Sequence, residues 1–309
     1  MVWVTDRRNE LQKKDGRHKV KLAFVILNFG TYAETTDCVS SIVEHIDIDD
    51  YKIVIVDNGS KDDSLNRLQK KYWNNERIDV LSTGKNLGFA QGNNVGIKYV
   101  NENYSPDFVV VLNSDIELFQ DELYARLLTE YKHSHFGVWG PMMIIGTARC
   151  DDSPWAPMSL AQAREELEVY EKKYQRLEHL PYFLYRAVNK IASTFIKQRG
   201  EQRKHEDFWR YQTDVELQGA FLVFSKEMFQ HIKGFDPRTF LYYEEQLLYL
   251  AVKRTGMKMV YDPRYAVYHK DGVSTKKIKS SKSKLLFLQH CNIESLKILI
   301  TEMEKEATE

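Results

Sequence analysis

The chain has 309 residues and a formal net charge of zero, because 44 lysine and arginine residues balance 44 aspartate and glutamate residues. This length suits one large α/β domain or one domain with an insertion, and the balanced charge gives no indication of nucleic-acid binding. No apolar run reaches about 18 residues, so we expect no membrane-spanning helix.

Residues 1–18 are polar and charged, and we expect this tail to be poorly ordered. The stretch from Ala23 to Asp115 contains three apolar runs that end on polar residues, with helix-length segments between them. Such runs are typical of buried parallel strands in a βαβ sheet. A helix should begin at Ser60, which stands at an N-cap position before two aspartates. We expect the other elements of this half as strands at 20–28, 51–56, 78–81 and 108–112 and helices at 31–46, 89–100 and 121–132.

The second half of the chain begins with an expected strand at 137–145. Residues 151–214 are then crowded with charged and aromatic side chains and show no obvious strand, so we interpret them as a helical insertion. We therefore expect one domain over 19–274, followed over 275–309 by a basic linker and an amphipathic helix. The remaining expected elements are helices at 159–180, 182–199, 244–255 and 285–304 and strands at 215–224, 258–261 and 265–269.

Polar residues stand where the expected strands end, and in parallel sheets ligands bind beyond those ends. Asn28 ends the first strand, and Asp57 and Asn58 end the second, which indicates a nucleotide ligand. A carboxylate at Asp57 can accept a hydrogen bond from the imide N–H of uracil or thymine, although Asp-Asn-Gly is also ordinary turn chemistry. The glycine- and asparagine-rich loop at 84–97 either approaches the ligand closely or only begins a helix. Asp115, after the central strand, either holds a hard divalent cation or only caps the strand.

The motifs VDNGS, KNLGFAQGNN and LNSD occur in this order before the stretch from Leu217 to Ser274. In this combination the chain resembles the family 2 glycosyltransferases, and within them the rhamnosyltransferase-like branch of bacterial polysaccharide synthesis. The resemblance covers about residues 21–274, apart from the insertion. It implies a GT-A fold, in which a mostly parallel nucleotide-binding α/β sheet flanked by helices merges with an acceptor-binding half. It also implies an inverting single displacement from a nucleotide sugar.

The resemblance further implies roles for individual residues. Asp57 would read a pyrimidine base, which indicates a UDP- or dTDP-sugar donor, and Asp115 and His269 would hold Mg²⁺ or Mn²⁺. Glu245 matches the position of the general base, with Glu244 beside it as the alternative. The other implied residues are Asn86, Asn94 and Ser114 near the nucleoside and Gly219 and Asp236 on the acceptor side.

Three departures from the family pattern bear on donor geometry and metal dependence. The usual Glu-Asp-x-Asp run reads Glu-Glu-Gln-Leu at 244–247, so its last acid is missing. Asn113 takes the first position of the DxD motif, and Gly30 stands where the family tends to have asparagine.

The acceptor implied by the resemblance is a glycan or a polyprenyl-linked glycan of a bacterial surface polysaccharide. We expect a cytosolic protein, because the charged N-terminus lacks the apolar core of a signal peptide and the three cysteines lack disulfide spacing. Peripheral contact with the inner face of the membrane stays open, since Lys276 to Lys284 contains five lysines and no acid, and Tyr182 to Arg199 mixes apolar and basic side chains. A solvated basic face is the alternative.

Two other functions stay open from the sequence. The altered acidic run at 244–247 is compatible with a catalytically weak scaffold or regulator that binds sugar nucleotides. A nucleotidyltransferase would also couple a parallel sheet to a metal, but it should carry a basic, glycine-rich loop after the first strand. The segment NFGTYAETTD has neither lysine nor arginine.

Overall fold

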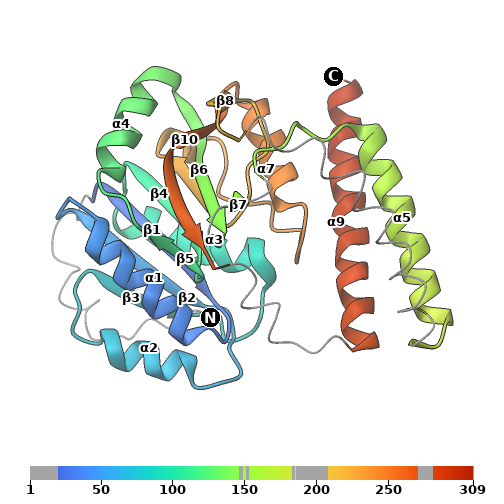
Figure 1. Ribbon diagram of the computed structural model, residues 1–309, viewed down its shortest axis with the longest axis horizontal. Coiled ribbons are helices and arrows are strands. Elements are labelled where there is room, and N and C mark those ends of the chain that lie inside the picture. Colours follow the sequence, from blue (N-terminus) through green and yellow to red (C-terminus); the bar gives the residue numbers. More distant parts are fainter. Residues whose placement is uncertain are drawn as a thin grey trace.

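The computed structural model describes residues 20–145, 149–150, 153–182, 185, 208–270 and 281–308. Ten strands form one mixed sheet with helices on both faces (Figure 1). The strands are β1 Leu22–Asn28, β2 Tyr51–Asp57, β3 Ile78–Ser82, β4 Phe108–Asn113, β5 Ile116–Leu118, β6 Phe136–Ile145, β7 Arg149–Cys150, β8 Gln212–Thr213, β9 Phe221–Ser225 and β10 Lys258–His269. The helices are α1 Tyr32–His45, α2 Ser64–Tyr72, α3 Gly88–Asn103, α4 Leu123–Ser134, α5 Leu160–His179, α7 Glu244–Arg254 and α9 Lys282–Thr308, with a 3-10 turn at Glu227–Gln230.

The sheet order is β3-β2-β1-β4-β9-β6-β10-β5. The first four strands pair in parallel, as the buried apolar runs predict. In the other half β9 runs antiparallel to both β4 and β6, and β10 is parallel to β6 but antiparallel to β5. The α/β fold is therefore confirmed, with the parallel strands concentrated in the first half of the sheet.

Both faces of the sheet are covered, which explains why its strands are almost continuously apolar. Along β1, Phe24 and Ile26 face the core under α1, α2 and α4, whereas Ala23 and Val25 face the core under α3 and α7. This alternation follows from the two-residue period of a strand. The sheet is a rigid platform, and the residues beyond its strand ends are positioned by it.

Several element boundaries differ from the sequence-based expectation. The N-cap predicted at Ser60 is wrong, because α2 begins at Ser64 and Ser60 instead bonds to neighbouring strand ends. The two strands expected at 258–261 and 265–269 form one strand, β10, whose pairing with β6 shifts register between Asp262 and Ala266. The strand expected at 215–224 pairs as a regular strand only from Phe221.

The expected helix at 159–180 is confirmed as α5, which begins at a capping box formed by Ser159 and Gln162. It packs antiparallel against α9, and the two helices stand side by side at one end of the molecule (Figure 1). Lys282 at the start of α9 donates from Nζ to the carbonyl oxygens of Glu178 and Leu180 at the end of α5, 3.0 and 3.2 Å away. The second expected helix of the insertion, at 182–199, lies outside the described residues except for Tyr182 and Tyr185.

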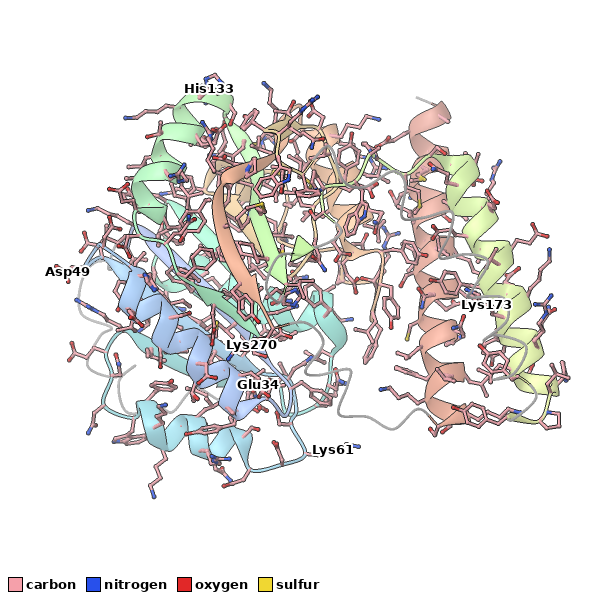
Figure 2. The ribbon with its side chains drawn as sticks, in the orientation of Figure 1. Glu34, Asp49, Lys61, His133, Lys173 and Lys270 are labelled. Atoms are coloured by element: carbon pink, nitrogen blue, oxygen red, sulfur yellow. The ribbon has the colours of Figure 1, made fainter. Side chains whose placement is uncertain are left out.

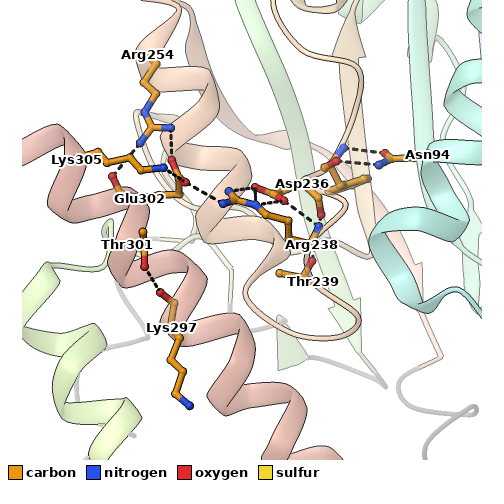
Figure 3. Close-up of polar contacts among 10 residues, drawn as sticks. Asn94, Asp236, Arg238, Thr239, Arg254, Lys297, Thr301, Glu302 and Lys305 are labelled. Carbon is orange, nitrogen blue, oxygen red and sulfur yellow. Dashed lines mark hydrogen bonds and ion pairs between the residues drawn. The ribbon is translucent and has the colours of Figure 1, made fainter.

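Helix α9 is held to the sheet domain by a charged network (Figure 3). Glu302 accepts hydrogen bonds from Arg238 Nη1 and Arg254 Nη1, each at 3.0 Å, and from Lys305 Nζ at 2.8 Å. Arg238 also bonds to Asp236 in the loop that precedes α7. No helix in the described part of the chain has both the length and the apolar character needed to span a membrane.

Candidate active site

The ends of β1 and β2 are joined by a buried hydrogen-bond cluster. Asn28 and Asp57 are register partners in the parallel pair, and Asn28 Nδ2 donates to Asp57 Oδ2 at 2.7 Å. Ser60 donates to the same carboxylate through its backbone N–H at 3.1 Å and its hydroxyl at 2.5 Å. Thr31 and Thr35 donate from their hydroxyls to Asn28 Oδ1. The strand ends expected at the nucleotide site are therefore brought together.

These bonds decide what Asp57 can still do. A carboxylate offers about four acceptor positions, and three bonds from Asn28 and Ser60 engage Asp57, only one of them at Oδ1. One position at Oδ1 is what an imide N–H would need. The side chain is only 1% exposed, so a base would reach it only if neighbouring side chains moved.

The loop after β3 is attached to the end of β2 through Asn58. The Asn58 amide donates to the carbonyl of Gly88 at 3.0 Å and to Asn86 Oδ1 at 3.2 Å, and its oxygen accepts from the N–H of Leu87 at 3.0 Å. Gly59 has φ of +74°, and a Cβ atom there would lie 2.4 Å from the backbone carbon of Lys85. The glycine is therefore required for this close approach. Asn58 thus shapes the loop, while Asn86 remains exposed at its surface.

Asn94, expected near the nucleoside, makes a different contact. Its amide donates to the carbonyl of Phe235 and accepts from the N–H of the same residue, both at 2.8 Å. These bonds attach α3 to the loop before α7. Assignment of Asn94 to nucleotide binding stays a prediction that this contact does not support.

Asp115 and His269 meet at the end of the central strand. The antiparallel pairing of β5 with β10 sets His269 opposite Ile116, next to Asp115. His269 Nε2 lies 3.5 Å from Asp115 Oδ1, and both side chains are 8% exposed. Ser114 is buried beside them and shares a 2.9 Å hydrogen bond with Thr31, so the LNSD motif is tied to the cluster at β1.

The pair fits a divalent cation that also binds a diphosphate. An oxygen and an imidazole nitrogen are both suitable donors for such an ion, and Mg²⁺ and similar ions usually take one or two protein ligands plus phosphate oxygens and water. No group of three histidine, cysteine or acidic side chains with metal-site spacing occurs among the residues that the structure describes. The protein would thus supply a two-residue site that a substrate completes.

Lys270 adds a cation beside this pair. Figure 2 labels it where β10 ends, over α1. Its Nζ atom pairs with Asp37 at 2.8 Å and Glu117 at 2.6 Å, and its N–H donates to the carbonyl of Asp115 at 2.9 Å. This backbone bond fixes the separation between the end of β10 and the LNSD motif.

The two glutamates predicted as catalytic begin α7. Glu244 is 3% exposed, and its Oε1 atom has no hydrogen-bond partner among the described residues. Burial, with the nearby charge of Glu245, raises the pKa of Glu244 to about 8. Burial also raises the pKa of Glu245. A carboxylate in a poorly solvated site holds a proton more strongly, and buried acids with raised pKa values are candidates for proton transfer.

Gly219 connects Glu245 to the central strand. The Gly219 N–H donates to Glu245 Oε1 at 3.1 Å, and the carbonyl of the next residue, Ala220, accepts from the N–H of Asn113 at 2.9 Å. A Cβ atom at Gly219 would lie 2.7 Å from Glu245 Oε1. Gly219 was expected on the acceptor side. In the structure it holds Glu245, the candidate base, beside the end of β4.

Asp236, the other residue expected on the acceptor side, is engaged by Arg238. The Arg238 side chain donates to both carboxylate oxygens, and its N–H donates to Asp236 Oδ1 at 2.9 Å. Through Arg238 the carboxylate joins the network that holds α9 (Figure 3). An acceptor role for Asp236 stays a prediction.

Sequence reasoning missed Glu216, which lies close to Glu244 and Glu245. Its carboxylate accepts from the N–H of Met158 at 2.7 Å and from Gln246 Nε2 at 3.0 Å. Burial raises its pKa to about 6. An acid just before the apolar run at 220–224 was the available signal, but its partners in the insertion and in α7 could be identified only in three dimensions.

A protein-family model and several known proteins match this chain in sequence. The family model described as "Glycosyl transferase family 2" matches residues 24–232. Rhamnosyltransferase WbbL of Escherichia coli (strain K12) is 25% identical over 239 residues, which are 75% of this chain and 78% of that protein. The N-acetylglucosaminyl-diphospho-decaprenol L-rhamnosyltransferase of Mycobacterium tuberculosis (strain ATCC 25618 / H37Rv) is 25% identical over 230 residues, or 72% of this chain and 67% of that protein.

Two solved structures share the fold. The crystal structure of S. aureus TarS 1–349 has a TM-score of 0.50 and 13% identity, with 92% of this chain and 70% of that chain covered. The crystal structure of GalNAc-T7 with UDP, GalNAc and Mn²⁺ has a TM-score of 0.58 and 14% identity, and the match covers 93% of this chain but only 48% of that one.

Proposed function

Because the chain belongs to glycosyl transferase family 2, we propose that it moves a sugar from a UDP- or dTDP-sugar to a glycan or polyprenyl-linked acceptor, with inversion at the anomeric carbon. The product would be part of a bacterial surface polysaccharide, as the resemblance of the sequence motifs implies, and the name of the decaprenol rhamnosyltransferase relative supports a polyprenyl-linked acceptor. One observation carries the proposal. The segment Gly219–Ala220 is hydrogen-bonded to Glu245 on one side and to Asn113 on the other, which sets a proton acceptor next to the LNSD motif.

In the proposed reaction Glu245 removes the proton from an acceptor hydroxyl while that oxygen attacks the anomeric carbon. The bond between the anomeric carbon and the diphosphate oxygen breaks, so the nucleoside diphosphate leaves from the opposite face and the configuration inverts. The Gly219 N–H orients the Glu245 carboxylate, and burial raises its pKa, which makes the carboxylate a stronger base than an exposed glutamate. Glu244 stays protonated beside it up to a pH of about 8, which keeps the pair from carrying two buried charges.

Asp115 and His269 would hold a Mg²⁺ or Mn²⁺ ion at the diphosphate. When bound, such an ion neutralises charge on the leaving group. The GalNAc-T7 structure, which has the same fold, contains UDP and Mn²⁺, and this supports the use of a divalent ion in general. Lys270 lies next to the pair, and its ammonium group is engaged by Asp37 and Glu117.

The donor base would be a pyrimidine, held at the ends of β1 and β2 with Asp57 as its reader. Calorimetry with UDP, dTDP and GDP tests this assignment. We expect UDP or dTDP to bind in the presence of metal and GDP to bind at least tenfold more weakly. Equal affinity for GDP would show that Asp57 does not select the base.

Contact with a membrane surface would suit a polyprenyl-linked acceptor. Of the lysine run at 276–284, Lys282 is used to cap α5, and the residues 276–280 lie outside the described part of the chain. Phe287 is 47% exposed and belongs to the same helix, α9, as Lys282 and Lys284. Sedimentation with anionic and neutral vesicles at two salt concentrations tests the contact, and pelleting with neither kind would contradict it.

Release of UDP or dTDP from a panel of nucleotide sugars tests the proposed activity itself. An active transferase should hydrolyse its own donor slowly without acceptor and faster with acceptor. A chain that binds the sugar nucleotide but releases no nucleotide with any donor or acceptor extract would be a binding scaffold instead.

A further inference from the structure

Two consecutive tyrosines in left-handed conformation precede the catalytic pair. Tyr242 has φ of +74° and Tyr243 has φ of +63°, and Tyr243 is the N-cap of α7. Bulky side chains rarely adopt this conformation, which persists only where surrounding contacts impose it. Because Glu244 and Glu245 follow directly, this turn sets the direction in which both carboxylates leave the backbone.

The contacts that impose the turn come from the insertion and from α9. Tyr243 is 8% exposed and packs in a cluster with Ala163 of α5 and Leu296 of α9. Its hydroxyl donates to Glu166 Oε2 of α5 at 2.6 Å. On α9, the Ser295 hydroxyl donates to the carbonyl of Leu241, just before the turn, at 3.0 Å.

A second link from the insertion, through Glu216, reaches Gln246, which follows Glu244 and Glu245 in the chain. Gln246 donates from Nε2 to Glu216 Oε2 at 3.0 Å, and Glu216 Oε1 accepts from the N–H of Met158, just before α5, at 2.7 Å. Tyr243 is therefore bonded to the insertion directly and Gln246 is linked to it through Glu216, and Glu244 and Glu245 lie between them.

We infer that the inserted helix α5 is a positioning element for the general base, and that Glu166 and Tyr243 are its positioning residues. The inference rests on the proposed function, because it assigns Glu245 the role of base. Glu166 touches neither donor nor acceptor in this scheme. It holds the left-handed turn that aims Glu245 at the acceptor hydroxyl and keeps the Gly219 bond aligned.

Three variants test the inference in the full-length chain. Tyr243→Phe removes only the hydroxyl and keeps the buried ring, Glu166→Ala removes its acceptor, and Glu166→Gln keeps a neutral acceptor at the same place. Misplacement of a catalytic group by about 1 Å can lower a rate about 100-fold. We expect Tyr243→Phe and Glu166→Ala to lower kcat about 10- to 100-fold, with unchanged KM for the donor and unchanged affinity for UDP or dTDP.

Two comparisons separate positioning from general support of the fold. The double variant that combines Tyr243→Phe with Glu166→Ala should be no slower than the slower of the two single variants. The reason is that both changes remove the same hydrogen bond. Glu166→Gln should recover part of the lost kcat, and Glu165→Gln, an exposed neighbour on α5, should behave as wild type.

The outcomes are distinct. An active wild type whose kcat is unaffected by Tyr243→Phe and Glu166→Ala would overturn the inference but leave the proposed function intact. Parallel losses in kcat, donor affinity and melting temperature would also overturn it, because the bond would then support the fold as a whole. A wild type that transfers no sugar would overturn the proposed function first.

Discussion

Asp115 Oδ1 lies 3.5 Å from His269 Nε2, although the two residues belong to different halves of the chain. The pairing of β5 with β10 creates this proximity, since it sets His269 opposite the residue that follows Asp115. Both side chains are buried at the carboxyl end of the sheet. A buried acid and imidazole at this edge are well placed to share an ion with a bound diphosphate.

Replacing Asp115 by asparagine tests the metal site. Asn has the same shape but no charge, so metal-dependent binding of UDP or dTDP should be lost while the melting temperature changes little. Calorimetry with and without Mn²⁺ measures the effect. Asp49→Asn is a matched control, because Asp49 lies before β2, is exposed and pairs with Arg77. Full activity of Asp115→Asn would exclude it as a metal ligand.

Glu245→Gln tests the general base. Removal of a positioned base typically slows the chemical step by roughly 10²- to 10⁴-fold, and donor affinity should be retained. Single-turnover transfer measures the step directly. Because burial raises the pKa of Glu245, wild-type activity should rise with pH as that carboxyl loses its proton. An inactive Glu244→Gln together with an active Glu245→Gln would exchange the two roles.

Much of the first half of the fold follows from local sequence. The apolar runs before Asn28, Asp57 and Asn113 predict parallel strands because each run is short, buried and separated from the next by a helix-length segment. The position of Asp115 at the edge of the sheet could be predicted for the same reason, since it follows a buried strand. In parallel sheets ligands bind at that edge.

Contacts between distant elements could not be predicted in this way. The turn at Tyr242 and Tyr243 has no glycine to indicate positive φ, and its support comes from Glu166 in an insertion whose docking leaves no periodic signal. Ser60 has the residue type and flanking acids of an N-cap. Its hydroxyl instead donates to the Asp57 carboxylate and accepts from the Gly30 N–H, so it does not cap a helix. Local propensity therefore failed where a tertiary partner was available.

The buried Glu244 should make stability depend on pH. Its pKa is about 8 in the folded chain and 4.5 as the ordinary value, so between these values the folded state binds more protons than the unfolded state. Stability should therefore fall as pH rises from about 4.5 to about 8. Glu244→Gln removes this titration. The free energy of unfolding of the variant, minus that of wild type, should therefore be more positive at pH 8 than at pH 5. Thermal unfolding at both pH values measures it, and an equal difference at both would contradict the assignment.

Glu302 should have the opposite pH dependence, because Lys305, Arg254 and Arg238 hold its pKa at about 2. A lowered folded-state pKa stabilises the chain above the ordinary value of 4.5, and this stabilisation is lost as pH falls from about 4.5 toward 2. Glu302→Gln should therefore loosen α9 by roughly 1 kcal/mol at pH 7, a modest value because both arginines are partly exposed. Hydrogen exchange of the α9 amides measures the change. Glu294→Gln is a control on the same helix, because the Glu294 side chain pairs with Lys297 of α9 itself. Unchanged protection of α9 in Glu302→Gln at pH 7 would show that apolar packing against α5, rather than this network, holds the helix in place.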